Sequence, residues 1–144
     1  MPITEAHAGR SYPPTTPYAV SAAKIAEFAT ALGDDSPAYS GPDAIAPPTF
    51  VAVVSAAAWE SMFADAELDL ALRRIVHGDQ RFSYVRPVRT GDVITAALTI
   101  DKVRARAGSE IISCSVRVQT VDGEEICTAS STFFHSRESQ EAAS

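Results

Sequence analysis

One segment constrains the fold more than any other part of the chain. Residues 49–63, TFVAVVSAAAWESMF, are apolar on nearly every helical face until Glu60. A helix without a polar side must be buried. Alanine favours helix, and the run is long for a strand. The sequence therefore predicts a buried helix that starts near Pro48-Thr49 and ends near Phe63.

From Arg74 onward the apolar residues recur with period two, which is typical of β strands. The predicted strands cover residues 76–84, 94–100, 112–118 and a last stretch that ends at Phe134, with turns at 90–92, at Gly108 and at the residue pair 122–123. An antiparallel meander buries one face only if something covers it, and the apolar helix is the natural cover. We expect one α+β domain over residues 1–144.

The N-terminal half carries a second predicted helix. Ser21 is a good N-cap, Gly33 is placed for a left-handed C-cap, and the segment between them has one apolar face. That face comprises Ile25, Phe28, Ala29 and Leu32. The prolines before Tyr18 favour extended or turned backbone. The polar tail from Ser136 to Ser144 has no apolar anchor, so we expect it to be frayed.

The composition excludes some classes of function. A net charge of −6 argues against nucleic acid as the main partner. No apolar run reaches the roughly 20 residues of a membrane span, and the first residues do not form a signal peptide, so we expect a cytoplasmic protein. Residues 73–117 nevertheless carry nine basic and four acidic side chains. This segment is either a docking face for an acidic carrier or a phosphate-bearing cofactor, or a set of solvated strand edges.

The two cysteines give no sign of a disulfide. A two-residue turn at Asp122-Gly123 would place Cys127 opposite Val118 and Cys114 opposite Ser131. The sulfurs would then lie about 13 Å apart along the strands, too far for a bond. We expect two buried, reduced thiols.

Three motifs carry a family resemblance. They are Tyr18-x-Val20-x5-Ala26-x-Phe28-x2-Ala31-x-Gly33-Asp34-x2-Pro37, then Ala46-Pro47-Pro48-Thr49-Phe50, and His77-Gly78-Asp79-Gln80-x-Phe82-x-Tyr84-x-Arg86-Pro87-Val88-x2-Gly91-Asp92. Together they resemble the MaoC-like dehydratase N-terminal family, and within it the accessory subunits of actinobacterial (3R)-hydroxyacyl-ACP dehydratase heterodimers. The resemblance runs from about Tyr12 to Phe134. It implies a hot-dog fold, an antiparallel sheet wrapped around a buried central helix.

The resemblance also implies a catalytic pattern, from which this chain departs twice. Competent members carry G-D-x-x-P-x-H after the first helix, and a His-Gly pair opens the buried helix. Here Asp34 matches the aspartate, but Tyr39 stands in place of the histidine. A phenol with a reference pKa of about 10 does not exchange protons near neutral pH as an imidazole does. Pro47-Pro48 replaces His-Gly, so the backbone donor expected for an enolate oxygen is missing.

Other readings of these residues stay open. Asp34 is either a catalytic remnant or the cap of a turn. His77 and Asp79 are two apart on a strand and could form an acid–base couple on one face, although an interface histidine is the more common role. We expect the substrate to contact residues of the pocket loops, the helix and the first strand. These are Tyr39, Pro48, Thr49, Val51, Val54, Trp59, Phe63, Phe82 and Tyr84, several of which could equally be core.

The resulting functional hypothesis is a subunit of an (R)-specific enoyl thioester hydratase or 3-hydroxyacyl-ACP dehydratase of fatty acid metabolism. We expect it to bind substrate, to be catalytically incomplete, and to need a homologous hot-dog partner in a hetero- or homodimer. No metal or other cofactor is expected, because the acyl chain arrives on acyl carrier protein or coenzyme A. The alternatives are a homodimeric thioesterase-like protein and a non-enzymatic acyl-binding module.

Overall fold

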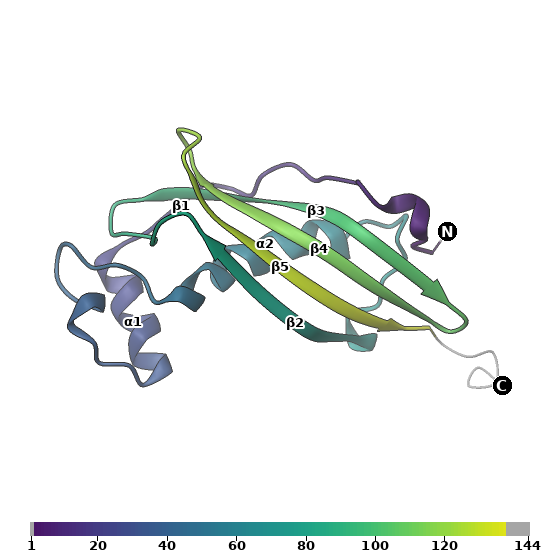
Figure 1. Ribbon diagram of the computed structural model, residues 1–144, viewed down its shortest axis with the longest axis horizontal. Helices are drawn as coiled ribbons and strands as arrows, with labels where there is room; N and C mark the ends of the chain where they lie inside the picture. Colours follow the sequence, from purple (N-terminus) through teal and green to yellow (C-terminus); the bar gives the residue numbers. More distant parts are fainter. Residues whose placement is uncertain (1, 138–144) are drawn as a thin grey trace.

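The computed structural model describes residues 2–137, which form two helices and one five-stranded sheet (Figure 1). The helices are α1 (Ala22–Leu32) and α2 (Ala52–Phe63). The strands are β1 (Tyr18–Ala19), β2 (Ile75–Tyr84), β3 (Val93–Arg106), β4 (Ser109–Thr120) and β5 (Glu125–Ser136). Four short 3₁₀ turns complete the described elements: η1 (Glu5–His7), η2 (Pro37–Tyr39), η3 (Pro48–Val51) and η4 (Leu72–Arg74). No helix of residues 2–137 is long and apolar enough to cross a membrane.

Both ends of α1 agree with the sequence prediction. The Ser21 side chain accepts a hydrogen bond from the Lys24 N–H, and Gly33 adopts the left-handed conformation at a φ of 72°. Ile25 and Ala29 are buried, whereas Leu32 is 53 % exposed. The apolar face is therefore one turn shorter than predicted.

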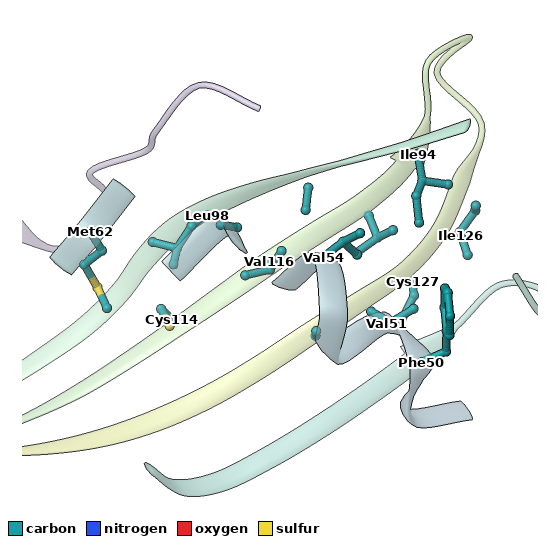
Figure 2. Packing of buried hydrophobic residues seen from close by; sticks show 14 of the residues in the cluster. Phe50, Val51, Val54, Met62, Ile94, Leu98, Cys114, Val116, Ile126 and Cys127 are labelled. Carbon is teal, nitrogen blue, oxygen red and sulfur yellow. The ribbon is translucent and has the colours of Figure 1, made fainter. Parts of the chain in front are cut away.

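The predicted buried helix is confirmed, with a 3₁₀ start. Residues 48–51 form η3 because Pro48 fixes the first turn, and α2 continues to Phe63. Figure 2 shows Phe50, Val51 and Val54 from this segment among buried sheet residues such as Leu98 and Val116. The sheet curls around α2 in the hot-dog arrangement that the resemblance implies (Figure 1).

The sheet order corrects the predicted meander. β3, β4 and β5 follow one another as expected, but β2 pairs with β5 at one edge of the sheet, giving the order β1-β3-β4-β5-β2. The connection from β2 to β3 must therefore cross the end of the sheet. Sequence periodicity locates strands but carries no information on which strands pair.

The opposite edge of the sheet is covered by the N-terminal segment, which runs along β3 (Figure 1). The N–H groups of Gly9 and Tyr12 donate to the carbonyls of Ile100 and Leu98. The Thr15 N–H donates in the same way to Ala96. These bonds occupy backbone groups of β3 that would otherwise face solvent. Among the described residues, β2 is left as the open edge of the sheet.

The turn between β4 and β5 is one residue longer than predicted. Thr120 donates its N–H to the Glu124 carbonyl across the loop 121–123, and Gly123 has a φ of 94°. A glycine in this left-handed position is typical of a three-residue hairpin loop. The predicted partners of the cysteines are nevertheless correct, Val118 opposite Cys127 and Cys114 opposite Ser131. Both cysteines are free and buried.

β5 extends two residues past the predicted strand end at Phe134. His135 is buried inside β5, and its Nδ1 lies 2.9 Å from Glu110. Its Nε2 accepts the Ala71 N–H, so Nδ1 carries the ring proton and donates to the carboxylate. Ser136 belongs to β5, and Arg137 contacts the same Glu110 at 2.6 Å. The rest of the predicted tail, residues 138–144, lies outside the described part of the chain.

Candidate functional site

A largely apolar pocket of about 310 Å³ lies at the end of β2. Its walls come from three places: the η2 turn, the segment that leads into η3, and the chain that leaves β2. The lining residues are Tyr39, Ile45, Ala46, Pro48, Tyr84, Val85, Arg86 and Pro87. An apolar hollow with few polar groups is the usual form of a small-molecule site.

A hydrogen bond joins two walls of this pocket. The Tyr84 hydroxyl donates to the carbonyl oxygen of Pro48, which connects the end of β2 to the start of the central helix. Burial raises the pKa of Tyr84, so its hydroxyl stays protonated and remains a donor. Tyr39 faces the same hollow from η2. Two phenols and no imidazole are thus present in the lining.

A charge cluster fixes the third wall. Arg86 makes a two-pronged contact with Asp92, at 2.9 and 3.0 Å, and a third contact with Glu124 at 2.7 Å. Burial disfavours the charged form of Asp92, but hydrogen bonds from Arg86 and from the Arg89 N–H outweigh it and lower the pKa of the carboxyl group. The cluster folds residues 85–87 back against the pocket. Arg86 is therefore a neutralised, structural cation.

The structure brings only part of the predicted substrate set together. Tyr39, Pro48 and Tyr84 line the pocket, and the Phe82 ring lies 6.3 Å from that of Tyr84. Val51 and Val54 are fully buried in the core instead. Thr49 is exposed at the start of the central helix, outside the lining.

Trp59 and Phe63 belong to a separate aromatic cluster. Both rings pack edge-to-face on Phe133 of β5, at centroid distances of 5.0 and 5.5 Å. The His77 ring packs on Trp59 and Phe133 at 5.1 Å. The cluster packs against the core: the Trp59 and Phe63 rings are half-buried, and His77 lies at its exposed margin.

The structure does not bring the His77 and Asp79 side chains together on one face, as the predicted couple would need. Gly78 forms a β-bulge, so that His77 pairs with Phe133 and Asp79 pairs with Thr132, the preceding residue of β5. Neighbouring residues of β5 point to opposite faces, and their partners therefore do so too. The imidazole Nε2 contacts the backbone carbonyl of Asp79 at 3.0 Å, while the carboxylate lies beside Arg81.

Asp34 lies outside the pocket lining and has a local structural role. Its carboxylate accepts the Ser36 N–H at 3.0 Å and closes the turn after α1. This geometry matches the turn-capping reading. No group of three or more His, Cys, Asp and Glu side chains within residues 2–137 is arranged to hold a metal ion.

Sequence reasoning missed five residues of the lining: Ile45, Ala46, Val85, Arg86 and Pro87. Arg86-Pro87 lies in the third motif, so a signal was present, but the position of this segment against the pocket depends on Asp92 and Glu124.

The cations of the basic segment 73–117 differ in their surroundings. Arg86 is paired, whereas Lys102, Arg104 and Arg106 lie on β3 without an ion pair to any described residue. Arg86 therefore contributes no unpaired charge to a docking face on this segment.

The fold and the pocket together define a hot-dog domain of the MaoC-like dehydratase type. A chain of the "C terminal truncated HadBC (3R-Hydroxyacyl-ACP Dehydratase) complex" of Mycobacterium tuberculosis superimposes with a TM-score of 0.77 at 28 % identity, covering 89 % of this chain and 96 % of that one. The R-hydratase PhaJ1 of Pseudomonas aeruginosa shares the fold, with a TM-score of 0.69 at 16 % identity over 91 % of this chain and 83 % of that one.

Sequence comparison gives the particular family. Residues 6–129 match the model described as FAS1-like, dehydratase domain region, and the chain belongs to this family. A UPF0336 protein of Cutibacterium acnes is 51 % identical over 137 residues, which covers 95 % of this chain and 96 % of that protein. A UPF0336 protein of Streptomyces coelicolor is 44 % identical over 138 residues, covering 90 % and 92 %.

Proposed function

We propose that this chain is the substrate-binding, catalytically incomplete subunit of an (R)-specific enoyl thioester hydratase or 3-hydroxyacyl-ACP dehydratase. The observation that carries the proposal is the pocket, which has the apolar walls of an acyl site but no general base. Its titratable side chains are Tyr39, Tyr84 and Arg86. None of them is an imidazole or a carboxyl group, the side chains that most often act as general bases.

Hydration of a conjugated thioester needs one group to activate water and one to supply the α-proton. In this chain Asp34 closes a turn and His77 is packed between aromatic rings, so neither lies in the pocket lining. A homologous hot-dog subunit would supply the missing Asp/His pair. The HadBC complex, whose chain is similar over almost its full length, supports a partner of this kind.

The remaining residues give the subunit a binding role. Tyr39, Pro48 and Tyr84 would contact the acyl thioester, and the Tyr84–Pro48 hydrogen bond would hold the two walls at a fixed separation. Substrate would arrive on acyl carrier protein or coenzyme A, and no resident cofactor takes part. Pro47 and Pro48 have no backbone N–H. Thr49 is therefore the first residue of the central helix whose backbone could donate a hydrogen bond.

The test compares the protein alone with the protein co-expressed with a hot-dog subunit that carries an intact Asp/His pair. Alone it should hydrate a trans-2-enoyl thioester at background rate, whereas the complex should be active. Within the complex, Tyr39→Phe should change kcat only a few-fold, and replacing the partner's histidine should lower it by roughly a hundredfold or more. High activity of the lone protein, lost in Tyr39→Phe or His77→Ala, would contradict the proposal and favour a self-sufficient thioester enzyme.

A further inference from the structure

The open edge at β2 ends beside the pocket. Among residues 2–137 no strand covers the outer side of β2, while the far edge of the sheet is bonded to the N-terminal segment. Large apolar side chains are exposed along and beyond β2: Leu72 at 64 %, Val76 at 64 % and Val85 at 72 %. Exposed apolar groups on an open strand favour pairing with another strand.

If two hot-dog subunits pair through this edge, the symmetry of the pair decides which ends of their β2 strands lie side by side. A two-fold axis between two copies of one strand makes the pair antiparallel. The last residues of β2 in one subunit then lie beside the first residues of β2 in the other. The pocket lies at the last residues, Tyr84 to Arg86, and η4 precedes the first. In such a pair, with the two β2 strands aligned along their length, each pocket would lie next to η4 of the opposite subunit.

The η4 turn carries an uncompensated positive charge. Arg73 is exposed and has no hydrogen bond or ion pair with another described residue. It borders a second hollow of about 330 Å³, whose walls also include Ala71 and Arg137. Arg137 is already bound to Glu110 and Asp69. The pocket itself offers only Arg86, which two carboxylates neutralise.

We propose that Arg73 of one subunit extends the pocket of the subunit across the β2 edge and binds the phosphate of the substrate's carrier group. The inference rests on the proposed function, and it adds a binding residue supplied in trans. The combined site is apolar at the Tyr39–Tyr84 end and cationic at the η4 end. That polarity matches an acyl chain joined through pantetheine to a phosphate, which guanidinium groups bind well.

The test measures binding of one enoyl chain on three carriers: coenzyme A, phosphopantetheinylated acyl carrier protein, and uncharged N-acetylcysteamine. The protein is used as it assembles, alone and with its catalytic partner. Arg73→Ala should weaken binding of the coenzyme A thioester roughly tenfold, since a hydrogen bond to a charged group is lost, and should leave N-acetylcysteamine binding unchanged. Arg73→Lys should restore part of the loss. Arg104→Ala, which removes an unpaired cation from β3, is the matched control and should change neither.

Each result has a distinct meaning. Weakening for both charged carriers assigns Arg73 to the pantetheine phosphate, and weakening for coenzyme A alone assigns it to the nucleotide phosphates. Equal effects on charged and uncharged thioesters, no effect at all, or loss of the dimer in Arg73→Ala would each reject the inference. Loss of the dimer would mean that Arg73 pairs with an acidic group across the edge. If the wild-type protein binds no thioester on any carrier, the proposed function itself fails.

Discussion

The ring of Phe134 on β5 lies so close to Gly78 on β2 that a Cβ atom at position 78 would overlap its Cε2 atom. The two residues meet on the outer face of the sheet, at the bulge that shifts the pairing of β2 with β5. The bulge places the His77 ring inward, on Trp59 and Phe133. The bulge that sets the face of the imidazole and the close approach of the Phe134 ring thus occur at the same glycine.

Gly78→Ala should therefore destabilise the protein by about 1–2 kcal/mol, because the added methyl group must displace the Phe134 ring. Urea unfolding at pH 7 measures the loss. The same substitution in a Phe134→Ala background should cost clearly less, since nothing then lies over position 78. Equal costs in both backgrounds would mean that the bulge, and not the ring, requires glycine.

Tyr84→Phe should lower the free energy of unfolding by about 1 kcal/mol, the usual worth of a hydrogen bond, because the Pro48 carbonyl loses its donor. It should also weaken acyl thioester binding, since two pocket walls are no longer joined. Tyr18→Phe is the matched control: the Tyr18 ring packs on Phe50, but its hydroxyl donates to no described residue. Identical behaviour of the two variants would show that the Tyr84 hydroxyl is dispensable.

Asp92→Asn should make stability less dependent on pH. The folded protein lowers the pKa of Asp92, so the carboxylate stabilises the fold at pH values above its unfolded pKa of about 4, and this contribution disappears as pH falls through the folded pKa. The variant should thus be weaker than wild type at pH 7, with a gap that narrows toward pH 3. Urea unfolding across that range is the measurement. A constant gap would assign the effect to packing.

Cysteines placed at both ends of the open edge should cross-link two subunits. The pKa of Cys114 is raised to about 12 and that of Cys127 to about 11, chiefly by burial, so the native thiols react slowly near pH 8. Leu72→Cys combined with Val85→Cys should give a covalent dimer with a short bis-maleimide, because antiparallel pairing brings the two positions together. Val121→Cys, exposed at the β4–β5 turn, is the control that should give no covalent dimer on a denaturing gel. A double variant that also gives no covalent dimer would exclude pairing through β2.

The sequence predicted the helices better than the sheet. Ser21 and Gly33 are local signals that bound α1, and the lack of any polar face on the central helix required its burial. Both inferences depend on residues close together in the chain. The hot-dog architecture came from the three motifs, and the comparisons and the structure confirm it.

The features that were missed depend on contacts distant in sequence. The bulge at Gly78 was read as part of a regular alternation, because only the register with β5 reveals it. The buried contact of His135 is of the same kind, because its partner, Glu110, lies on a neighbouring strand. In the pocket, the resemblance pointed to Tyr39, Pro48 and Tyr84, but the wall formed by Val85 needs the Arg86–Asp92 contact to exist.

The N-terminal segment bonded along β3 has a consequence for assembly size. A sheet with two unpaired edge strands can pair with a further copy at each edge and grow without limit. A sheet with one edge already covered stops growing once its other edge has paired. The backbone bonds of Gly9, Tyr12 and Thr15 occupy β3, so another subunit cannot add its strand there, and among the described strands β2 is left open. The same N-terminal residues that complete the sheet also keep a second subunit from pairing with β3.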